Sequence, residues 1–213
     1  MSLKNNSNRI YDIKIILLGE TGVGKTSLIK TYFDQPFNPS ERPTLDGNIT
    51  SKILEINNKK MRINIWDTMG HEKYRAITQQ FFKGSNIVIF VFDITNRASF
   101  LDLGFWVNSV LEKLSKEEAI FGVIGNKIDL FTKSEIEATE AEEYAEKIGA
   151  LFTEASAAKN PEGLKRFINI LLERLVQTPT IIEKLGKIDE ESNIHLENTP
   201  IKKKKKKCCN KSN

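Results

Sequence analysis

The sequence predicts an α/β domain in three layers: a six-stranded, mostly parallel sheet with one antiparallel edge strand and helices on both faces. Short apolar runs alternate with segments of helical periodicity, which is typical of a parallel sheet whose strands are joined by helices. A glycine-rich turn directly follows the first apolar run, and a polar turn joins the second and third. In such a doubly wound sheet, ligand-binding loops lie at the carboxyl ends of the strands.

Six segments have the pattern of strands. Those at Ile87–Phe92 and Ile120–Ile124 are continuously apolar, as expected of parallel strands covered on both faces. In another, Met61, Ile63 and Ile65 alternate with polar residues, which indicates a half-buried strand. The polar turn before it predicts a hairpin. The six predicted strands are Ile13–Leu18, Ile49–Ile56, Met61–Trp66, Ile87–Phe92, Ile120–Ile124 and Leu151–Ala155.

Helical periodicity lies between these strands. In one segment Leu101, Phe105, Leu111 and Leu114 recur at roughly helical spacing. In the next, Gly149 stands where a C-cap glycine is expected. The last has a clear amphipathic face. The four predicted helices are Thr26–Phe33, Phe100–Leu114, Ala138–Ile148 and Glu162–Val176.

Composition divides the 213 residues into one globular domain at 10–177, a polar flexible N-terminus at 1–9 and a tail at 178–213. Residues 1–177 carry 23 Lys+Arg and 23 Asp+Glu, whereas the tail carries 9 and 5, so the tail holds the whole net charge of +4. A basic tail on a neutral body predicts contact with a membrane or polyanion, and it counts against a nucleic-acid-binding domain.

Both cysteines, Cys208 and Cys209, lie in the tail. The body therefore has no disulfide framework, as expected of a cytosolic protein. The N-terminus is polar and does not have the pattern of a signal peptide. The longest apolar run, Ile87–Phe92, is far too short to cross a bilayer.

Residues Gly19–Thr26 read Gly-Glu-Thr-Gly-Val-Gly-Lys-Thr and fit the phosphate-loop pattern G-x-x-x-x-G-K-[ST] between a strand and a helix. Backbone N–H groups of the turn would point at phosphate oxygens, and the helix from Ser27 would add its positive end. Lys25 would reach the outer phosphates, and the Thr26 hydroxyl would ligate Mg²⁺. A ligand-free glycine-rich turn is the alternative, and the strand–turn–helix context counts against it.

Three further residues are predicted to act near the phosphates. Asp67 directly follows a strand and would hold Mg²⁺ through water. Gly70 would let a backbone N–H approach the terminal phosphate. Thr44 lies in the long loop before the hairpin, and its hydroxyl would join Mg²⁺ when a third phosphate is present. Phe37 in the same loop would pack against the base, with a simple packing contact as the alternative.

Asn126-Lys127-Ile128-Asp129 follows the fifth strand and predicts a base-binding loop. A fixed carboxylate that accepts two N–H bonds suits guanine, because adenine offers no such pair of donors on that edge. Asp129, with Asn126, is therefore assigned to base selection. The small residues of Glu154–Ala157 end the sixth strand and would let the Ala157 backbone reach the base carbonyl.

In their order and spacing these motifs resemble those of Ras-type small GTPases, over about residues 10–177. Within that superfamily the chain is similar to the Rab family, through Tyr74–Thr78, Phe81–Gly84, Phe90–Thr95 and the paired cysteines. The resemblance implies the P-loop NTPase fold, GTP and Mg²⁺ binding, slow hydrolysis to GDP and two conformations read by partners. It implies a catalytic group of Lys25, Thr44, Gly70 and His71, and nucleotide contacts from Thr21, Gly22, Val23, Gly24, Lys25, Thr26, Ser27, Phe37, Thr44, Gly70, Asn126, Lys127, Asp129, Ser156, Ala157 and Ala158.

The Rab resemblance also implies partners. Ile49, Trp66 and Phe81 would form an apolar patch to which effector proteins bind. A guanine nucleotide exchange factor, a GTPase-activating protein, a GDP-dissociation inhibitor and the prenylation machinery are further expected partners of a monomeric protein. Nucleic acid is not an expected partner.

The tail resembles the lipid-anchored tails of Rab proteins. Lys202–Lys207 precede Cys208 and Cys209, and paired cysteines near a Rab C-terminus receive geranylgeranyl groups. Two lipids and a polybasic run meet the two-signal requirement for stable anchoring to an anionic membrane. We expect the cytoplasmic face of an intracellular membrane and a cytosolic pool. A nuclear localisation signal and a nucleic-acid-binding arm are the alternatives, and the cysteines count against both.

The chain departs from the family pattern at several positions. His71 stands where a glutamine usually orients the attacking water, and imidazole is shorter and more rigid than that amide. Met69 replaces an alanine and would crowd the terminal phosphate. These two changes predict weak intrinsic hydrolysis, with a GTP-binding scaffold of negligible hydrolysis as the alternative. Ala158 replaces an expected lysine, and Leu45–Asn48 differs from the usual Rab sequence.

Overall fold

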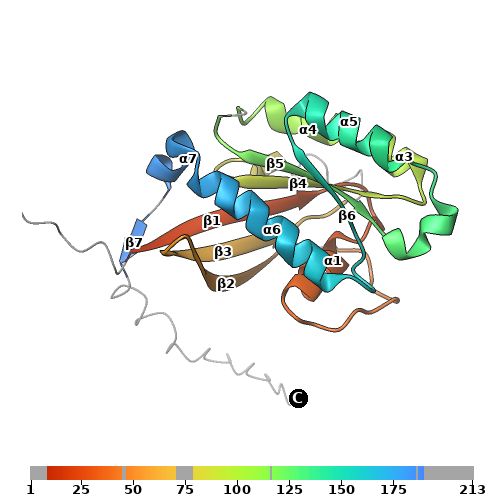
Figure 1. Ribbon diagram of the computed structural model, residues 1–213, viewed down its shortest axis with the longest axis horizontal. Coiled ribbons are helices and arrows are strands. Elements are labelled where there is room, and N and C mark those ends of the chain that lie inside the picture. The colour runs from red at the N-terminus through yellow and green to blue at the C-terminus, as the bar shows by residue number, and fades with distance from the viewer. Residues whose placement is uncertain (1–8, 45–46, 71–78, 116, 186, 190–213) are drawn as a thin grey trace, which may run out of the picture.

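The strands form the sheet that the sequence predicts. They are β1 (Arg9–Leu18), β2 (Asn48–Ile56), β3 (Lys59–Asp67), β4 (Ile87–Asp93), β5 (Ile120–Asn126) and β6 (Leu151–Ala155). Their order is β2-β3-β1-β4-β5-β6, and every neighbouring pair is parallel except β2 with β3 (Figure 1). These six strands confirm the predicted, mostly parallel sheet with one antiparallel edge strand, and a short seventh strand, β7 (Lys187–Asp189), is added to it beside β1. The computed structural model describes residues 9–44, 47–70, 79–115, 117–185 and 187–189.

The β2–β3 hairpin is made by the turn that the sequence predicts. Asn57 and Asn58 occupy the left-handed region, with φ of 49° and 59°. Asparagine tolerates this conformation, and a two-residue turn of that hand matches the twist of the flanking strands. Met61, Ile63 and Ile65 of β3 are buried while their neighbours are only half-buried, as the alternation predicts.

Helices cover both faces of the sheet. Alternate side chains of β1 divide between two cores: Ile15 and Leu17 pack with α1 and α6, whereas Ile16 and Leu18 pack with α3, α4 and α5 (Figure 1). The period of two along a strand produces this division. The helices are α1 (Lys25–Tyr32), α3 (Arg97–Leu101), α4 (Leu103–Leu111), α5 (Ala138–Ile148), α6 (Pro161–Val176) and α7 (Pro179–Lys184), with 3₁₀ turns η2 (Gln79–Phe81) and η3 (Ile128–Lys133).

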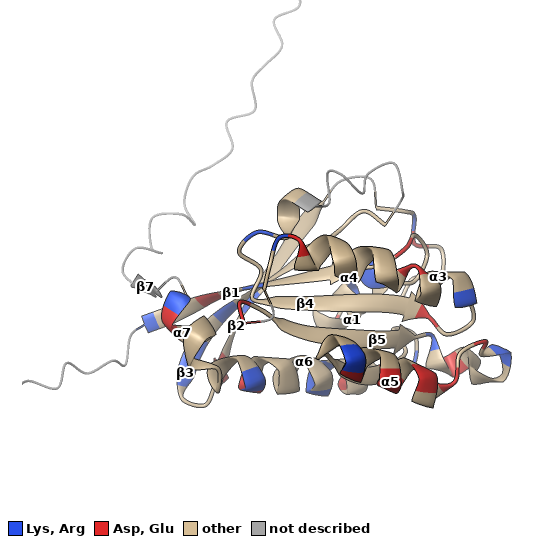
Figure 2. Cartoon of the chain, turned by 90° about the horizontal axis from the view of Figure 1, so that it is seen from above, with Lys and Arg blue, Asp and Glu red and all other residues tan. Residues whose placement is uncertain are grey.

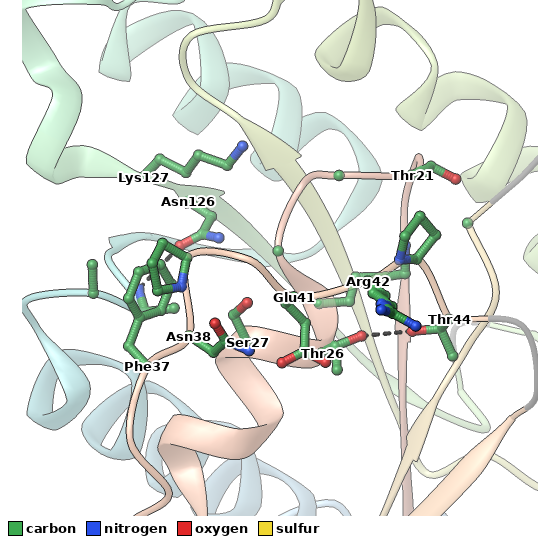
Figure 3. Close-up of a pocket in the computed structure, with 18 of the residues that line it drawn as sticks. Thr21, Thr26, Ser27, Phe37, Asn38, Glu41, Arg42, Thr44, Asn126 and Lys127 are labelled. Carbon is green, nitrogen blue, oxygen red and sulfur yellow. Dashed lines mark hydrogen bonds between the residues drawn. The ribbon is translucent and has the colours of Figure 1, made fainter.

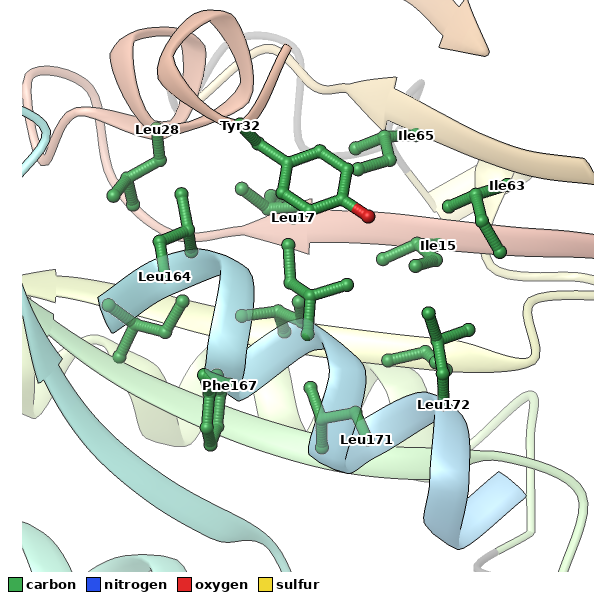
Figure 4. Packing of buried hydrophobic residues seen from close by; sticks show 14 of the residues in the cluster. Ile15, Leu17, Leu28, Tyr32, Ile63, Ile65, Leu164, Phe167, Leu171 and Leu172 are labelled. Atoms are coloured by element: carbon green, nitrogen blue, oxygen red, sulfur yellow. The ribbon is translucent and has the colours of Figure 1, made fainter. Parts of the chain in front are cut away.

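The start and the buried face of helix α6 follow from its sequence. Asn160 caps it by accepting a hydrogen bond from the Gly163 N–H at 2.9 Å, and Pro161 occupies its first turn, where a missing N–H costs nothing. Its apolar stripe is fully buried against the sheet (Figure 4). Burying each such side chain stabilises the fold by roughly 1.5–3 kcal/mol. The stripe is Leu164, Phe167, Ile168, Leu171, Leu172 and Leu175.

The predicted helix Phe100–Leu114 is wrong in two respects. The structure has two helices, α3 and α4, which meet at Asp102. Of the residues whose spacing suggested a helical face, Leu101 is 65% exposed, and Phe105 and Leu111 are also exposed; Leu114 is buried. The segment is apolar on more than one side, so periodicity alone does not choose the buried side. The residues that face the core are Phe100, Leu103, Trp106, Val107 and Val110.

The first residues of the predicted tail are ordered. Ile181 of α7 and Leu185 are buried against the α6 side of the core. A short strand, β7 (Lys187–Asp189), then pairs antiparallel with Arg9–Tyr11 of β1. The edge of β1 is available there because β4 pairs with it only from Ile15 onward. The lysine run and both cysteines lie outside the described residues.

Charged side chains of both signs are interspersed along the outer helices, while the strands β4 and β5 carry few (Figure 2). This distribution agrees with the balanced charge of residues 1–177. Within the described part of the chain, no helix has the length and apolar character needed to span a membrane.

Candidate functional site

A cavity of about 330 Å³ opens at the carboxyl ends of the strands. Its walls come from the phosphate loop with the start of α1, the loop before β2, and the segments after β3, β5 and β6 (Figure 3). Every residue predicted to contact the nucleotide lines this cavity except Val23 and Ser156. Val23 is buried in the core, and Ser156 lies behind the wall. Motifs from across the chain thus meet at one place.

Backbone conformation in the phosphate loop requires glycine. Gly22 and Gly24 have φ of 83° and 97°, a region that other residues rarely adopt. A Cβ on Gly24 would also lie 2.3 Å from Nδ2 of Asn126. Gly24 is the N-cap of α1, so the loop leads the positive end of this helix to the cavity.

The Lys25 ammonium is held inside the site. Its Nζ donates hydrogen bonds to the carbonyl oxygens of Gly19 at 2.8 Å and Glu20 at 2.9 Å. Burial lowers the pKa of Lys25 to about 8, although the charges of Asp67 and Glu20 act in the opposite direction. Gly70 packs directly against this ammonium, since a Cβ there would lie 2.4 Å from Nζ. A phosphate would supply an anionic partner for this buried cation, which forms no ion pair within the part of the chain that the structure describes.

The three predicted metal ligands lie together. Oγ1 of Thr26 is 2.7 Å from Oγ1 of Thr44, and the Thr44 hydroxyl donates to Oδ2 of Asp67 at 3.4 Å. The other carboxylate oxygen of Asp67 is buried and finds no hydrogen-bond partner among the described residues. Burial raises the pKa of Asp67, opposed by a hydrogen bond from Thr26. An unpaired buried carboxylate oxygen beside two hydroxyls fits Mg²⁺, which prefers oxygen ligands.

Asn126 ties two loops together. Its Nδ2 donates to the Val23 carbonyl at 2.7 Å, and its Oδ1 accepts from the Ala157 N–H at 3.3 Å. Because backbone groups engage both ends of this buried amide, Asn126 positions the phosphate loop and the loop after β6. Its expected part in base selection is therefore indirect. Thr31 supports the same loop, since its hydroxyl donates to the Ala157 carbonyl at 3.1 Å.

Asp129 and Lys127 are each held by a second side chain. The Ser156 hydroxyl donates to Oδ1 of Asp129 at 2.5 Å, which orients the carboxylate. Lys127 adopts the left-handed conformation, and its Nζ lies 2.6 Å from Oδ2 of Asp93. Sequence reasoning missed Asp93 as a supporting residue; its place at the end of the buried strand β4 was the available signal.

The loop before β2 contributes more to the cavity than was predicted. Phe37 lines the wall and is 44% exposed, which leaves its face open for a base or for solvent.

The segment after β3 also contributes to the wall. Oγ1 of Thr68 donates to the Leu17 carbonyl at 2.5 Å and thereby ties this segment to β1. Sequence reasoning missed several wall residues, although each lies close along the chain to Phe37, Thr44, Asp67 or Asp129. These are Asn38, Pro39, Glu41, Arg42, Pro43, Thr68 and Leu130.

The predicted apolar patch is assembled on the β2–β3 side. Ile49 stands opposite Trp66 in the strand register and is 48% exposed. The Trp66 and Phe81 rings lie 5.3 Å apart, centroid to centroid. Nζ of Lys14 lies 4.5 Å from the centroid of the Trp66 ring, a cation–π distance. The three residues therefore form one surface.

Comparison with known proteins identifies the family. The family model of the Ras family matches residues 14–177. Ras-related protein Rab-21 of Homo sapiens is 36% identical over 178 residues, which cover 84% of this chain and 78% of that protein. The chain is a small GTPase of the Rab family. Ras-related protein Rab-5A of Dictyostelium discoideum is 33% identical over 206 residues, 97% of this chain and all of that protein.

Membership of the Rab family gives the cavity a ligand class. Ras-family GTPases bind guanine nucleotides, generally with Mg²⁺, and the phosphate loop, oxygen cluster and Asp129 of this chain fit both. Rab proteins associate with intracellular membranes through lipid anchors. Of the unusual residues, Met69 is buried. His71, Cys208 and Cys209 lie outside the described residues, so their predicted roles stay predictions.

Proposed function

We propose that this Rab-family GTPase is a GTP/GDP switch that regulates vesicle traffic from the cytoplasmic face of an intracellular membrane. The observation that carries the proposal is the contact of Thr44 with Thr26 and Asp67 beside the Lys25 ammonium. A third phosphate and Mg²⁺ would hold the Thr44 loop in this place, and hydrolysis would release it. Effectors would read the difference at the patch of Ile49, Trp66 and Phe81.

Each part of the cavity has a separate role in this proposal. Lys25 and the phosphate-loop amides bind the phosphates, and Thr26, Thr44 and Asp67 hold Mg²⁺, which neutralises phosphate charge when bound. Asp129, oriented by Ser156, accepts the two N–H groups of guanine. The nucleotide is the substrate, and the protein contributes mainly positioning and charge.

Nucleotide selectivity tests the proposal. The nucleotide that copurifies with the full chain should be GDP or GTP by mass spectrometry. Calorimetry with Mg²⁺ present should show tight binding of guanylates and none of adenylates, and Asp129→Asn should shift the preference from guanosine to xanthosine nucleotides. Tight adenylate binding without guanylate binding would contradict the proposed function and favour a phosphate-transferring kinase.

Intrinsic hydrolysis is proposed to be slow because of His71 and Met69. His71 orients water poorly compared with a glutamine amide, and once protonated it only donates hydrogen bonds. Single-turnover GTP cleavage should therefore be faster in His71→Gln than in the natural protein. Equal rates would contradict this reasoning, and would favour the alternative in which a GTPase-activating protein supplies both an arginine and a glutamine.

Membrane anchoring is proposed to require lipids on Cys208 and Cys209, supported by Lys202–Lys207. Each lysine near an anionic surface contributes about 1 kcal/mol, and two lipids supply the stable part of the anchor. Changing both cysteines to serine should move the protein to the cytosolic fraction. Recovery of this variant with membranes at the natural level would contradict the anchor.

A further inference from the structure

Arg42 is distinguished from the other cations that line the nucleotide cavity. Lys25 is bonded to two carbonyl oxygens, and Lys127 is paired with Asp93. Arg42 also lines the cavity, but among the described residues its guanidinium makes no hydrogen bond or ion pair. An arginine has five donors, and because those of Arg42 find no acceptor among the described residues, they are available to an anion in the cavity.

The chain on both sides of Arg42 is anchored to α1. Oε2 of Glu41 lies 2.6 Å from Nζ of Lys30, and Oγ1 of Thr44 lies 2.7 Å from Oγ1 of Thr26. Glu41 forms an ion pair with Lys30 and not with its neighbour Arg42. These two contacts place residues 41–44 across the mouth of the cavity, next to the phosphate loop.

Pro43 favours an extended backbone at Arg42. A proline restricts the residue before it, so Pro43 disfavours a helical backbone at Arg42. In Figure 3 Arg42 is drawn beside Thr44, whose hydroxyl oxygen lies 2.7 Å from that of Thr26; both threonines are assigned to Mg²⁺. Residue 42 thus belongs to the part of the cavity wall that carries Thr44, where the terminal phosphate would be bound.

We propose that Arg42 is a catalytic residue for GTP hydrolysis, a guanidinium supplied by the same chain that contacts the terminal phosphate. This proposal rests on the function proposed above. Water attacks the γ-phosphorus, a new P–O bond forms, and the bond from phosphorus to the β–γ bridging oxygen breaks with its electron pair staying on GDP; the water protons end on phosphate and solvent. Negative charge shifts toward the bridging oxygen during this step, and a guanidinium fork is suited to stabilise it.

Arg42 and His71 would affect different parts of the reaction. His71 concerns the orientation of water, whereas Arg42 concerns charge on the phosphate. The slow hydrolysis proposed for this chain therefore does not conflict with an arginine in the same site. Lys25 of the phosphate loop is held by the carbonyl oxygens of Gly19 and Glu20, so its ammonium is separate from the guanidinium of Arg42.

The experiment compares four full-length proteins: the natural chain, Arg42→Ala, Arg42→Lys and the control Arg166→Ala. Arg166 is an exposed arginine of α6 outside the cavity wall. Single-turnover GTP cleavage should fall at least about tenfold in Arg42→Ala, a small part of the 10³–10⁵ known for arginine fingers, because the side chain is exposed. Arg42→Lys should fall between, since lysine keeps the charge but not the fork. The control should match the natural chain.

A second readout does not depend on turnover. Aluminium fluoride with GDP and Mg²⁺ imitates the transferring phosphoryl group, and a fluorescent GDP reports its binding. The natural chain and Arg166→Ala should bind aluminium fluoride without any activating protein, and Arg42→Ala should not. Affinity for GDP alone and the Tm should be the same in all four proteins, because Arg42 is exposed and makes no hydrogen bond or ion pair among the described residues.

The outcomes separate the two proposals. If GDP does not bind to any of the four proteins, the proposed function fails. If GDP binds and Arg42→Ala matches the natural chain both in cleavage and in aluminium fluoride binding, the catalytic role of Arg42 is wrong and its guanidinium serves a protein partner or solvent. Where cleavage is too slow to measure, the aluminium fluoride result decides.

Discussion

Replacing Asn126 by alanine tests the idea that one buried amide couples the phosphate loop to the base-binding side. The side chain is 2% exposed and makes two hydrogen bonds to backbone, at 2.7 Å to the Val23 carbonyl and at 3.3 Å from the Ala157 N–H. Alanine removes both partners and leaves both backbone groups buried. These two groups belong to different loops of the same cavity.

The expected loss follows from these two bonds. Leaving a buried polar group unpaired costs roughly 1–3 kcal/mol, so the loss of both partners should lower the free energy of unfolding by about 2–6 kcal/mol. For a domain of 150–250 residues, 1 kcal/mol corresponds to about 2–4 °C, which predicts a Tm lower by roughly 4–24 °C. Because the two loops lose their common tie, GDP should also dissociate at least about tenfold faster.

Differential scanning fluorimetry with saturating GDP and stopped-flow release of a fluorescent GDP measure these two effects. Asn108→Ala is the matched control: this asparagine is exposed on α4, so its replacement should change stability by no more than about 0.5 kcal/mol. If Asn126→Ala and Asn108→Ala have the same Tm and the same GDP release rate, the amide does not couple the loops and the reasoning is refuted.

Three further predictions concern buried positions. Gly70→Ala should weaken GTP binding, measured by fluorescent-nucleotide titration, because its Cβ would lie 2.4 Å from Nζ of Lys25 and 2.7 Å from the Glu20 carbonyl; Gly104→Ala, whose Cβ meets nothing within 4 Å, should bind normally. Tyr32→Phe should raise the free energy of unfolding by about 1 kcal/mol or more. The reason is that the Tyr32 hydroxyl is buried among aliphatic side chains (Figure 4) and has no hydrogen-bond partner among the described residues. An unchanged or lower free energy of unfolding, measured in urea, would contradict this prediction. The pKa of Lys25 is lowered from 10.5 to about 8 in the nucleotide-free fold, so the unfolded chain binds more protons between these values and stability should rise with pH across that window. The free energy of unfolding should rise by up to about 3 kcal/mol between pH 8 and pH 10.5, and this gain should be lost as the pH falls through 8. Lys25→Met should not show the rise, so parallel pH profiles of the two proteins would count against this prediction.

The predicted elements differ in how well the local pattern specified them. Strands β3 and β6 and helix α5 were specified closely, because each has a clear period or a clear end, such as the left-handed C-cap at Gly149. The segment that became α3 and α4 was specified poorly. It presents apolar side chains on more than one side, and the sheet selected Phe100 and Trp106 while leaving Leu101 exposed.

The candidate site was predicted at the level of motifs. The phosphate loop, Thr44, Asp67 and the loop after β5 were assigned to one pocket because all follow strands or lie between them. Their supporting contacts were not predictable. The bond from Ser156 to Asp129 joins residues 27 positions apart, and the pairing of Lys127 with Asp93 joins residues of adjacent strand ends. No local spacing records such pairs.

The sequence by itself determined the strands β1 to β6, the helices α1, α5 and α6, the order of the nucleotide-binding motifs and the Rab resemblance, because period, turn residues and motif spacing are local properties of the chain. Only the tertiary structure decided which side of α3 and α4 is buried, that α7 packs against the core, and that Arg42 lines the cavity without a hydrogen bond or ion pair among the described residues. These outcomes depend on contacts between segments that are far apart in the sequence, and such contacts form only when the sheet is assembled.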